Sequence, residues 1–178
     1  MTNSSISIDE LLRRAAVAQS VVHQLTGWSN VAELALDLAG SEAVAVTPSL
    51  SASCPQLTSA LGDRMCSPDP KNPFESIADA AVGVVEGALA VAETGSILLA
   101  QDDPCDRAVS MLSRIEIQVV NRDRIVSSLD EVATWIEANE GSLSLATLVT
   151  GPSRTADIER SLTIGVQGPS DLHMVILG

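Results

Sequence analysis

Aromatic side chains are scarce in this 178-residue chain, which has one Phe, two Trp and no Tyr. Proteins that bind single-stranded nucleic acids commonly stack the bases on aromatic side chains, so the composition disfavours that function. Because hydrophobic residues still make up 46% of the chain, its core must consist mainly of Ala, Val, Leu and Ile. Such a core is typical of helices packed on a parallel sheet.

Positive charge is scarce as well. Ten Lys and Arg residues stand against 23 Asp and Glu residues, which gives a formal net charge of −13 at pH 7. Nucleic-acid backbones and anionic membrane surfaces carry the same sign of charge, so we expect neither as a partner. The acidity has two interpretations: a soluble surface, or a face that binds a cationic partner.

Cysteines are few and widely spaced. Cys54, Cys66 and Cys105 form no C-x-x-C pair, so the sequence predicts neither a zinc site nor an iron–sulfur cluster. We therefore expect no metal and no redox cofactor. Free thiols are typical of proteins in a reducing cytosol, which predicts a cytoplasmic location.

No membrane-targeting segment is expected. Residues 1–10 contain neither a basic stretch nor an apolar one, so they do not resemble a secretory signal. The most apolar window, residues 77–100, is interrupted by Asp79, Glu86 and Glu93 and has the pattern of strands. The sequence therefore predicts no membrane span.

The length suits one domain with a sizeable core. We expect a single, complete domain over residues 1–178. Within it, helices should cover residues 1–40 and an α/β core should cover residues 41–178.

Two helices are predicted at the start of the chain. Apolar residues recur at helical spacing over residues 8–25, which predicts a first helix that ends at Gly27, and a second helix should cover residues 30–39. Residues 48–75 contain five prolines and should be the loosest segment, with one short helix near residues 57–61.

Short apolar runs then alternate with turns and helices. They predict strands at residues 43–47, 81–85, 88–92, 96–99, 115–120, 145–150 and 172–177. Further helices should lie at residues 107–112, after a capping box formed by Ser128 and Glu131, and at residues 155–162. The final strand, helix and strand predict a right-handed crossover. The expected fold class is therefore α/β, with an open, mostly parallel sheet and helices on both faces.

A candidate anion-binding loop leaves one predicted strand and enters a predicted helix at residues 150–154. Free N–H groups at a helix start bind anions at the carboxyl edge of a sheet, and Arg154 would add a bidentate partner for carboxylate or phosphate. Gly151, Ser153 and Arg154 are therefore candidate binding residues. Alternatively, Ser153 only caps the helix and Arg154 pairs with Asp157 or Asp171. The loop lacks the glycine spacings of dinucleotide and triphosphate sites.

Glu93 is a candidate catalytic residue because it stands at a strand end, just before Thr94 and Gly95. Gly95 supplies the positive φ of a tight turn and lets a ligand approach the backbone, where a carboxylate can act as base or nucleophile. Alternatively, Glu93 is structural or merely solvated. His23 and His173 are remote in the sequence and have no second ligand nearby, so neither predicts a metal site.

Four segments share a distinctive order and spacing: AETGS at residues 92–96, DRIV at 123–126, TGPSRTADIE at 150–159, and GVQGP at 165–169 followed by Leu172 and His173. Together they resemble the lactate-utilization protein C family, whose members carry a LUD domain. The resemblance covers residues 80–178 and is most specific at residues 151–159.

The resemblance implies the open α/β fold of the glucosamine-phosphate isomerase, ribose-phosphate isomerase and CoA-transferase group. It also implies a bacterial auxiliary subunit of a system that oxidises L-lactate to pyruvate, with iron–sulfur proteins as partners. The loop at residues 150–154 adds a small anionic metabolite as the expected ligand. One departure concerns the middle strand, where the family has a proline pair and a histidine and this chain has Ser113-Arg114-Ile115-Glu116. That departure leaves open a divergent paralogue with another substrate.

Three functions follow from these candidates. The first is the auxiliary subunit without a redox cofactor of its own. The second is a CoA-transferase-like enzyme, because Glu93-Thr94-Gly95 resembles the Glu-x-Gly turn in which those enzymes place a nucleophilic glutamate. The third is a sensor or scaffold that binds a small anion at Ser153 and Arg154.

Overall fold

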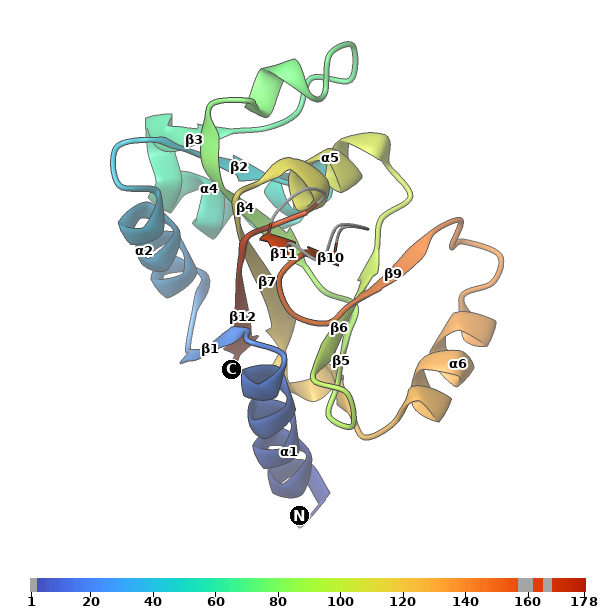
Figure 1. Ribbon diagram of the computed structural model, residues 1–178. Coiled ribbons are helices and arrows are strands. Elements are labelled where there is room, and N and C mark those ends of the chain that lie inside the picture. The colour runs from blue at the N-terminus through green and yellow to red at the C-terminus, as the bar shows by residue number, and fades with distance from the viewer. Residues whose placement is uncertain (1–2, 157–161, 165–167) are drawn as a thin grey trace.

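The computed structural model describes residues 3–156, 162–164 and 168–178. Its main sheet has six strands in the order β1-β12-β7-β4-β2-β3, and every neighbouring pair is parallel (Figure 1). The strands are β1 (Val21–Leu25), β2 (Ala43–Val46), β3 (Met65–Cys66), β4 (Ala80–Glu86), β7 (Ile115–Asn121) and β12 (Asp171–Leu177). The predicted open α/β sheet is therefore confirmed.

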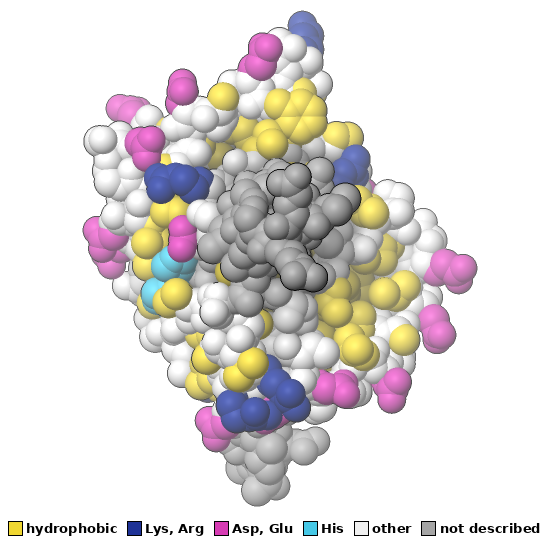
Figure 2. Space-filling model, viewed as in Figure 1, with side chains coloured by type: hydrophobic (Ala, Val, Ile, Leu, Met, Phe, Trp, Pro, Cys, Tyr) yellow, Lys and Arg dark blue, Asp and Glu magenta, His cyan; other side chains and the backbone are white. Residues whose placement is uncertain are grey.

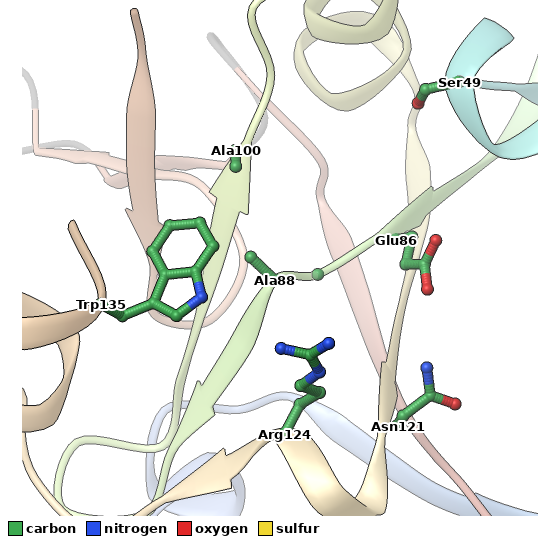
Figure 3. A pocket seen from close by; sticks show the side chains of 8 residues that line it. Ser49, Glu86, Ala88, Ala100, Asn121, Arg124 and Trp135 are labelled. Atoms are coloured by element: carbon green, nitrogen blue, oxygen red, sulfur yellow. The ribbon is translucent and has the colours of Figure 1, made fainter. Parts of the chain in front are cut away.

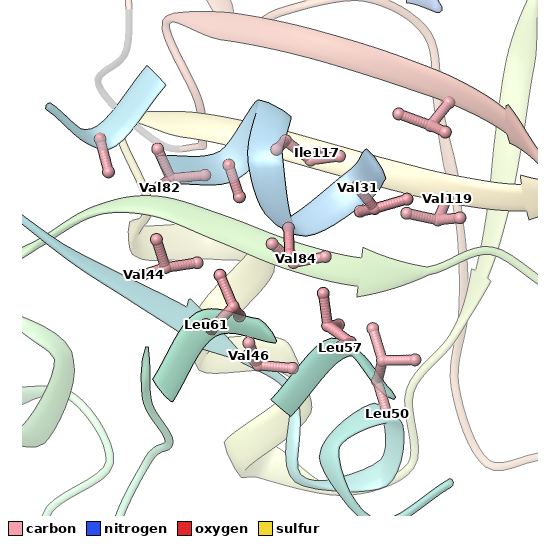
Figure 4. Close-up of a cluster of buried hydrophobic side chains, with 14 of the residues drawn as sticks. Val31, Val44, Val46, Leu50, Leu57, Leu61, Val82, Val84, Ile117 and Val119 are labelled. Carbon is pink, nitrogen blue, oxygen red and sulfur yellow. The ribbon is translucent and has the colours of Figure 1, made fainter. Parts of the chain in front are cut away.

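Helices cover both faces of this sheet, and the last helix of the chain packs on a smaller sheet. They are α1 (Asn3–Val17), α2 (Trp28–Ala39), α3 (Pro48–Ser53), α4 (Pro55–Leu61), α5 (Pro104–Leu112) and α6 (Leu129–Ala138), with single 3-10 turns η1 (Gly62–Arg64), η2 (Glu75–Ile77) and η3 (Arg122–Arg124). On one face, α2, α3 and α4 pack their apolar side chains against β2, β4 and β7 (Figure 4). On the other face, α1 and α5 share a second apolar cluster with two strands of the smaller sheet, β5 (Leu89–Val91) and β6 (Ser96–Ala100).

The central strands are buried on both faces, which explains their sequence pattern. The side chains of β4 from Ala81 to Val85 and of β7 from Ile115 to Val120 are all buried. A parallel strand covered on both sides reads as a continuous apolar run. Glu116 and Gln118 are exceptions to this pattern, because both are polar and both are buried inside β7.

A second, smaller sheet packs beside the first. Its order is β8-β5-β6-β9, and its strands are β5 (Leu89–Val91), β6 (Ser96–Ala100), β8 (Ile125–Val126) and β9 (Ala146–Val149). β6 is antiparallel to both β5 and β9. The expected sequence of strand, strand, turn and strand across residues 81–99 is thus confirmed, with Gly95 at φ 72° in the turn.

The first predicted helix is wrong in its second half. α1 ends at Val17, Gln19 takes a positive φ of 66°, and Val21–Leu25 form the edge strand β1 beside β12. Val22 and Leu25 fit a helical stripe, but pairing with a strand 150 residues away overrides the local pattern. Gly27, the predicted stop, instead precedes α2 in an extended conformation.

The predicted final crossover is also wrong. β9 joins the smaller sheet rather than the parallel one, and no helix starts at residue 155. Instead β10 (Arg154–Ala156) pairs in antiparallel fashion with β11 (Leu162–Ile164), where Thr155 faces Thr163. β-branched residues such as these favour strands. Residues 157–161 of the predicted helix lie outside the described residues.

Two smaller expectations need correction. Residues 48–75 are more regular than predicted, because α3 and α4 follow each other directly and the buried Leu50, Leu57 and Leu61 join the core. The capping box is incomplete: Glu131 Oε1 accepts a hydrogen bond from the N–H of Ser127 at 2.7 Å, but the side chain of Ser128 caps nothing.

Candidate functional site

The carboxyl edge of the parallel sheet contains a pocket. β2 is followed by β3 on one side, whereas β4, β7 and β12 lie on the other, so the strand order reverses between β2 and β4. Ligands of open α/β proteins bind outside the carboxyl ends of the strands at such a reversal. The pocket there measures about 300 Å³ and is called the carboxyl-edge pocket below (Figure 3). It is lined by Ser49, Glu86, Gly87, Ala88, Ala100, Asn121, Arg124 and Trp135.

The parallel register brings the polar residues of this pocket together. Glu86 is the last residue of β4 and Asn121 is the last residue of β7, its neighbour in the sheet. Arg124 ends η3, the turn that leaves β7, and Ser49 lies in the first turn of α3 after β2. Figure 3 shows the Arg124 guanidinium pointing into the space between Trp135 and Glu86.

Arg124 differs from the other arginines that the structure describes in full. Each of the others donates a hydrogen bond to a carboxylate, a carbonyl or an amide oxygen: Arg13, Arg14, Arg64, Arg107, Arg114 and Arg122. The guanidinium of Arg124 makes no hydrogen bond or ion pair within the described part of the chain. A free guanidinium in a pocket of so acidic a protein is a ready partner for a small anion.

Glu86 supplies a second charge at the pocket. Burial raises the pKa of its carboxyl group, and the positive charge of Arg124 opposes that rise. Because its side chain keeps contact with solvent, the group remains able to exchange protons. The pocket thus places a cation, a carboxyl of raised proton affinity and the amide of Asn121 around one space.

Sequence reasoning missed Glu86, Asn121 and Arg124 as site residues. The sequence did contain a feature that could have revealed this site, because Glu86 and Asn121 directly follow the predicted strands at residues 81–85 and 115–120. Polar residues that end adjacent parallel strands meet at one edge of a sheet. The sequence did not show that the two strands are neighbours.

The predicted binding loop lies at a different cavity, called the Gly151 cleft below. The cleft measures about 500 Å³, and Gly151 and Ser153 line it together with Gln101, Arg107 and Glu116. Gly151 has a φ of 76°, and a Cβ atom there would lie 2.2 Å from the backbone oxygen of Ala18. The lack of a side chain at Gly151 therefore lets the loop pack closely against the end of α1. Arg154 belongs to β10, and its side chain lies outside what the structure describes.

Glu93 and Gly95 line neither cavity. Glu93 is exposed, and its Oε2 atom accepts a hydrogen bond from the N–H of Leu129 at 3.2 Å, at the start of α6. A Cβ atom on Gly95 would lie 2.5 Å from the backbone nitrogen of Ala15 in α1. The structure thus gives both residues a structural contact, and the predicted roles in catalysis and anion binding stay predictions.

The metal-ligating residue types do not gather in the described part of the chain. No group of three or more His, Cys, Asp or Glu side chains there is arranged to hold a metal ion. Cys54 and Cys105 are buried and Cys66 is half-buried, all three as free thiols. Burial raises the pKa of Cys66 and of Cys105, which lowers the fraction of reactive thiolate. None of the described helices is long and apolar enough to cross a bilayer.

The fold and the pocket together define an open α/β protein with a candidate small-ligand pocket at the carboxyl edge of its sheet. The LUD domain family model matches residues 10–177, and the chain belongs to the LUD domain family. A DUF162 family protein from Deinococcus radiodurans has the same fold. Its crystal structure and this structure superpose over 100% of both chains, with a TM-score of 0.77 and 22% sequence identity.

Curated relatives match about half of the chain. The chain is similar to proteins named Lactate utilization protein C from Shouchella clausii (35% identical over 104 residues, 57% of this chain and 45% of the relative) and from Macrococcus caseolyticus (35% over 100 residues, 54% and 43%). A protein of the same name from Bacillus subtilis is 33% identical over 92 residues, which cover 49% of this chain and 38% of the relative. The matched segments span less than half the length of these relatives.

Proposed function

We propose that this LUD-domain protein takes part in lactate utilization by binding a small 2-hydroxy or 2-oxo carboxylate in the carboxyl-edge pocket. The observation that carries the proposal is the unpaired guanidinium of Arg124 at the point where the strand order reverses. The names of the curated relatives supply the substrate class. A pocket of about 300 Å³ lies within the size range of small-metabolite sites.

The pocket residues suit this ligand chemically. Arg124 would hold the carboxylate through two parallel N–H···O hydrogen bonds. The amide of Asn121 would bind the neighbouring hydroxyl or carbonyl oxygen. Glu86, whose pKa is raised by burial, would exchange a proton with that oxygen, as a general acid or base must. The indole of Trp135 would cover the apolar side of the ligand (Figure 3).

We further propose the role of an auxiliary subunit without a redox cofactor of its own. The isolated positions of Cys54, Cys66 and Cys105 in the sequence support this role, since cluster proteins hold iron with closely spaced cysteines. The electrons of lactate oxidation would then pass to iron–sulfur partner proteins, and the system would be cytoplasmic.

A CoA-transferase-like activity of Glu93 is the alternative. It would require the carboxylate to leave the N–H of Leu129, which it holds at 3.2 Å, before attacking a thioester. Anion binding at the Gly151 loop remains a further alternative. Among the described residues, neither the surroundings of Glu93 nor the Gly151 loop offers an unpaired cation comparable to Arg124.

Calorimetric titration with L-lactate and pyruvate tests the main proposal. The wild-type protein should bind at least one of them, and Arg124→Ala should weaken binding by about 100-fold, because a charge-assisted bidentate contact is lost. Arg122→Ala is the matched control, since Arg122 lies in the same turn but bonds Gln24. Equal binding by Arg124→Ala and wild type would show that the acid does not bind at Arg124. The proposal would be refuted if the wild-type protein bound neither acid.

A further inference from the structure

The Gly151 cleft contains buried polar groups without partners. Glu116 lines the cleft with its side chain only 1% exposed, and its Oε1 atom has no hydrogen-bond partner among the described residues. Gln118 lies two positions along β7 on the same face and is fully buried, and neither polar atom of its side chain has a partner there. Buried polar side chains are nearly always hydrogen-bonded, so each of these atoms needs an explanation.

Three other polar side chains that line the cleft, those of Gln101, Arg107 and Ser110, already have hydrogen-bond partners. Gln101 Nε2 donates to the backbone oxygen of Asp106 at 3.2 Å, and Ser110 Oγ donates to Gln101 Oε1 at 2.9 Å. Arg107 Nη1 donates to the backbone oxygens of Gln101 and Asp102, both at 2.9 Å. Among the buried side chains described at the cleft, the polar atoms without a partner therefore lie on β7, at Glu116 and Gln118.

Among the described residues, Glu116 also lacks a compensating cation. Among the described lining residues, Arg107 is the other ionisable one, and its guanidinium holds two carbonyl groups. Of the neighbouring charged groups, Asp106 accepts from the N–H of Ser49, and Arg114 and Asp171 are exposed. Burial raises the pKa of Glu116 to about 8, although the adjacent amide of Gln118 lowers it slightly. At neutral pH the carboxyl group is thus mostly protonated and carries an O–H donor.

The walls of the cleft are largely apolar. They comprise Leu99, Met111, Leu145, Leu148, Val149, Pro152 and Pro169. Figure 2 shows hydrophobic side chains gathered over β9 and toward α6, and Leu145 and Leu148 are among the exposed large hydrophobic residues there. Among the described residues, a charged ligand would lose its hydration against such walls without gaining a free counter-charge. An uncharged ligand with an apolar body suits them.

We propose that the Gly151 cleft is a second binding site, which takes an uncharged, largely apolar carbonyl compound and anchors its carbonyl oxygen on the O–H of Glu116. Gln118, which lies two positions along β7 on the same face, is a positioning residue for the carboxyl group. The site shares no lining residue with the carboxyl-edge pocket, so it can be occupied independently of the carboxylate proposed for that pocket.

Matched six-carbon probes test the proposal by calorimetry at about pH 6.5, where Glu116 should be protonated. Hexanamide should bind to the wild-type protein, and hexanoate should bind about tenfold more weakly. Glu116→Leu should lose about tenfold in hexanamide affinity, because one hydrogen bond disappears, whereas Glu116→Gln keeps a donor and an acceptor and should bind like wild type. The exposed Glu137→Gln is the control for charge alone.

The pH profile separates an anchoring role from mere packing. Hexanamide affinity of the wild type should fall as the pH rises past about 8, and that of Glu116→Gln should stay constant. Failure of wild type to bind hexanamide, equal affinity for hexanoate, or full affinity in Glu116→Leu would each overturn the proposal. Should Glu116→Leu not fold, the profiles of wild type and Glu116→Gln decide: parallel profiles overturn the proposal, and diverging profiles support it. Loss of lactate binding in Arg124→Ala leaves these outcomes unchanged.

Discussion

His23 Nε2 lies 2.9 Å from His173 Nδ1, so two imidazoles 150 positions apart in the sequence share one hydrogen bond. The rings are stacked, with centroids 5.2 Å apart and planes inclined by 11°. They come from the adjacent parallel strands β1 and β12, and the histidines are coloured cyan in Figure 2. Since one ring must accept the proton that the other donates, the pair is held together only while at least one ring is neutral.

The first prediction concerns this pair and pH. Burial lowers the pKa of His23 and of His173, and the charge of His23 lowers that of His173 further, while Asp171 opposes the change. The unfolded chain therefore binds more protons than the folded protein just below the ordinary pKa of about 6.5, so stability is full above that pH and falls as the pH drops through it.

Urea unfolding at several pH values measures this effect. His23→Gln should flatten the decline on the acid side and should lose about 0.5–1.5 kcal/mol at neutral pH through the weakened hydrogen bond. Because the chain has two histidines, NMR titration of the ring protons can be assigned from one substitution. Ordinary or raised pKa values for both rings would contradict the prediction.

The second prediction concerns Glu116, for which stability changes with pH in the opposite direction. Its pKa in the folded protein, about 8, lies above the ordinary value of about 4.5. The folded protein therefore holds a proton that the unfolded chain has lost between these pH values. The contribution of Glu116 to stability should be full below about pH 4.5 and should decline up to about pH 8, by roughly 5 kcal/mol at most. Glu116→Gln should remove this decline, as measured by urea unfolding from about pH 5 to 9. An unchanged slope in the variant would show that Glu116 is ionised at neutral pH.

The third prediction concerns the packing of the Gly151 loop on α1. Gly151→Ala should destabilise the protein by about 1–3 kcal/mol or more, because the residue has a positive φ and its new Cβ would meet the oxygen of Ala18. Gly141→Ala is the matched control, since a Cβ there has nothing within 4 Å, and it should be neutral or slightly stabilising. Thermal unfolding of the two variants gives the comparison. Equal midpoints would mean that the loop can move away from α1 at little cost.

The fourth prediction separates the structural and catalytic roles of Glu93. Glu93→Ala should lower stability by about 0.5–1 kcal/mol, because the N–H of Leu129 and the start of α6 lose an acceptor and a negative charge. Glu93→Gln keeps the acceptor and should lose less. If Glu93 is instead a nucleophile toward acyl-CoA, Glu93→Gln should abolish transferase activity in an assay with an acyl-CoA donor. Transferase activity retained in that variant would refute the nucleophilic role.

Local patterns along the chain were sufficient for the elements whose partners are close in sequence. The turn at Gly95, the strands around it and the helix after Ser128 all follow from spacing and turn chemistry within about twenty residues. The buried strands β4 and β7 were equally clear, because burial on both faces leaves a continuous apolar run. These segments were enough to establish the fold class.

Long-range pairing decided the rest. The apolar residues of Val21–Leu25 are compatible with a helix or a strand, and only the neighbouring β12 selects the strand. The same pairing brings His23 and His173 into contact. The adjacency of β4 and β7 likewise gathers Glu86, Asn121 and Arg124 into one pocket.

Amino-acid sequence by itself therefore determined the class of fold and the family resemblance, because both depend on local pattern and composition. Tertiary structure alone decided which ionisable groups lie without a partner among the described residues. Arg124 is one arginine among several in the sequence, and Glu116 is one glutamate in an apolar strand. Whether such a group finds a partner depends on segments far away in the chain. The lack of a partner among the described residues is the property that distinguishes each of the two proposed sites.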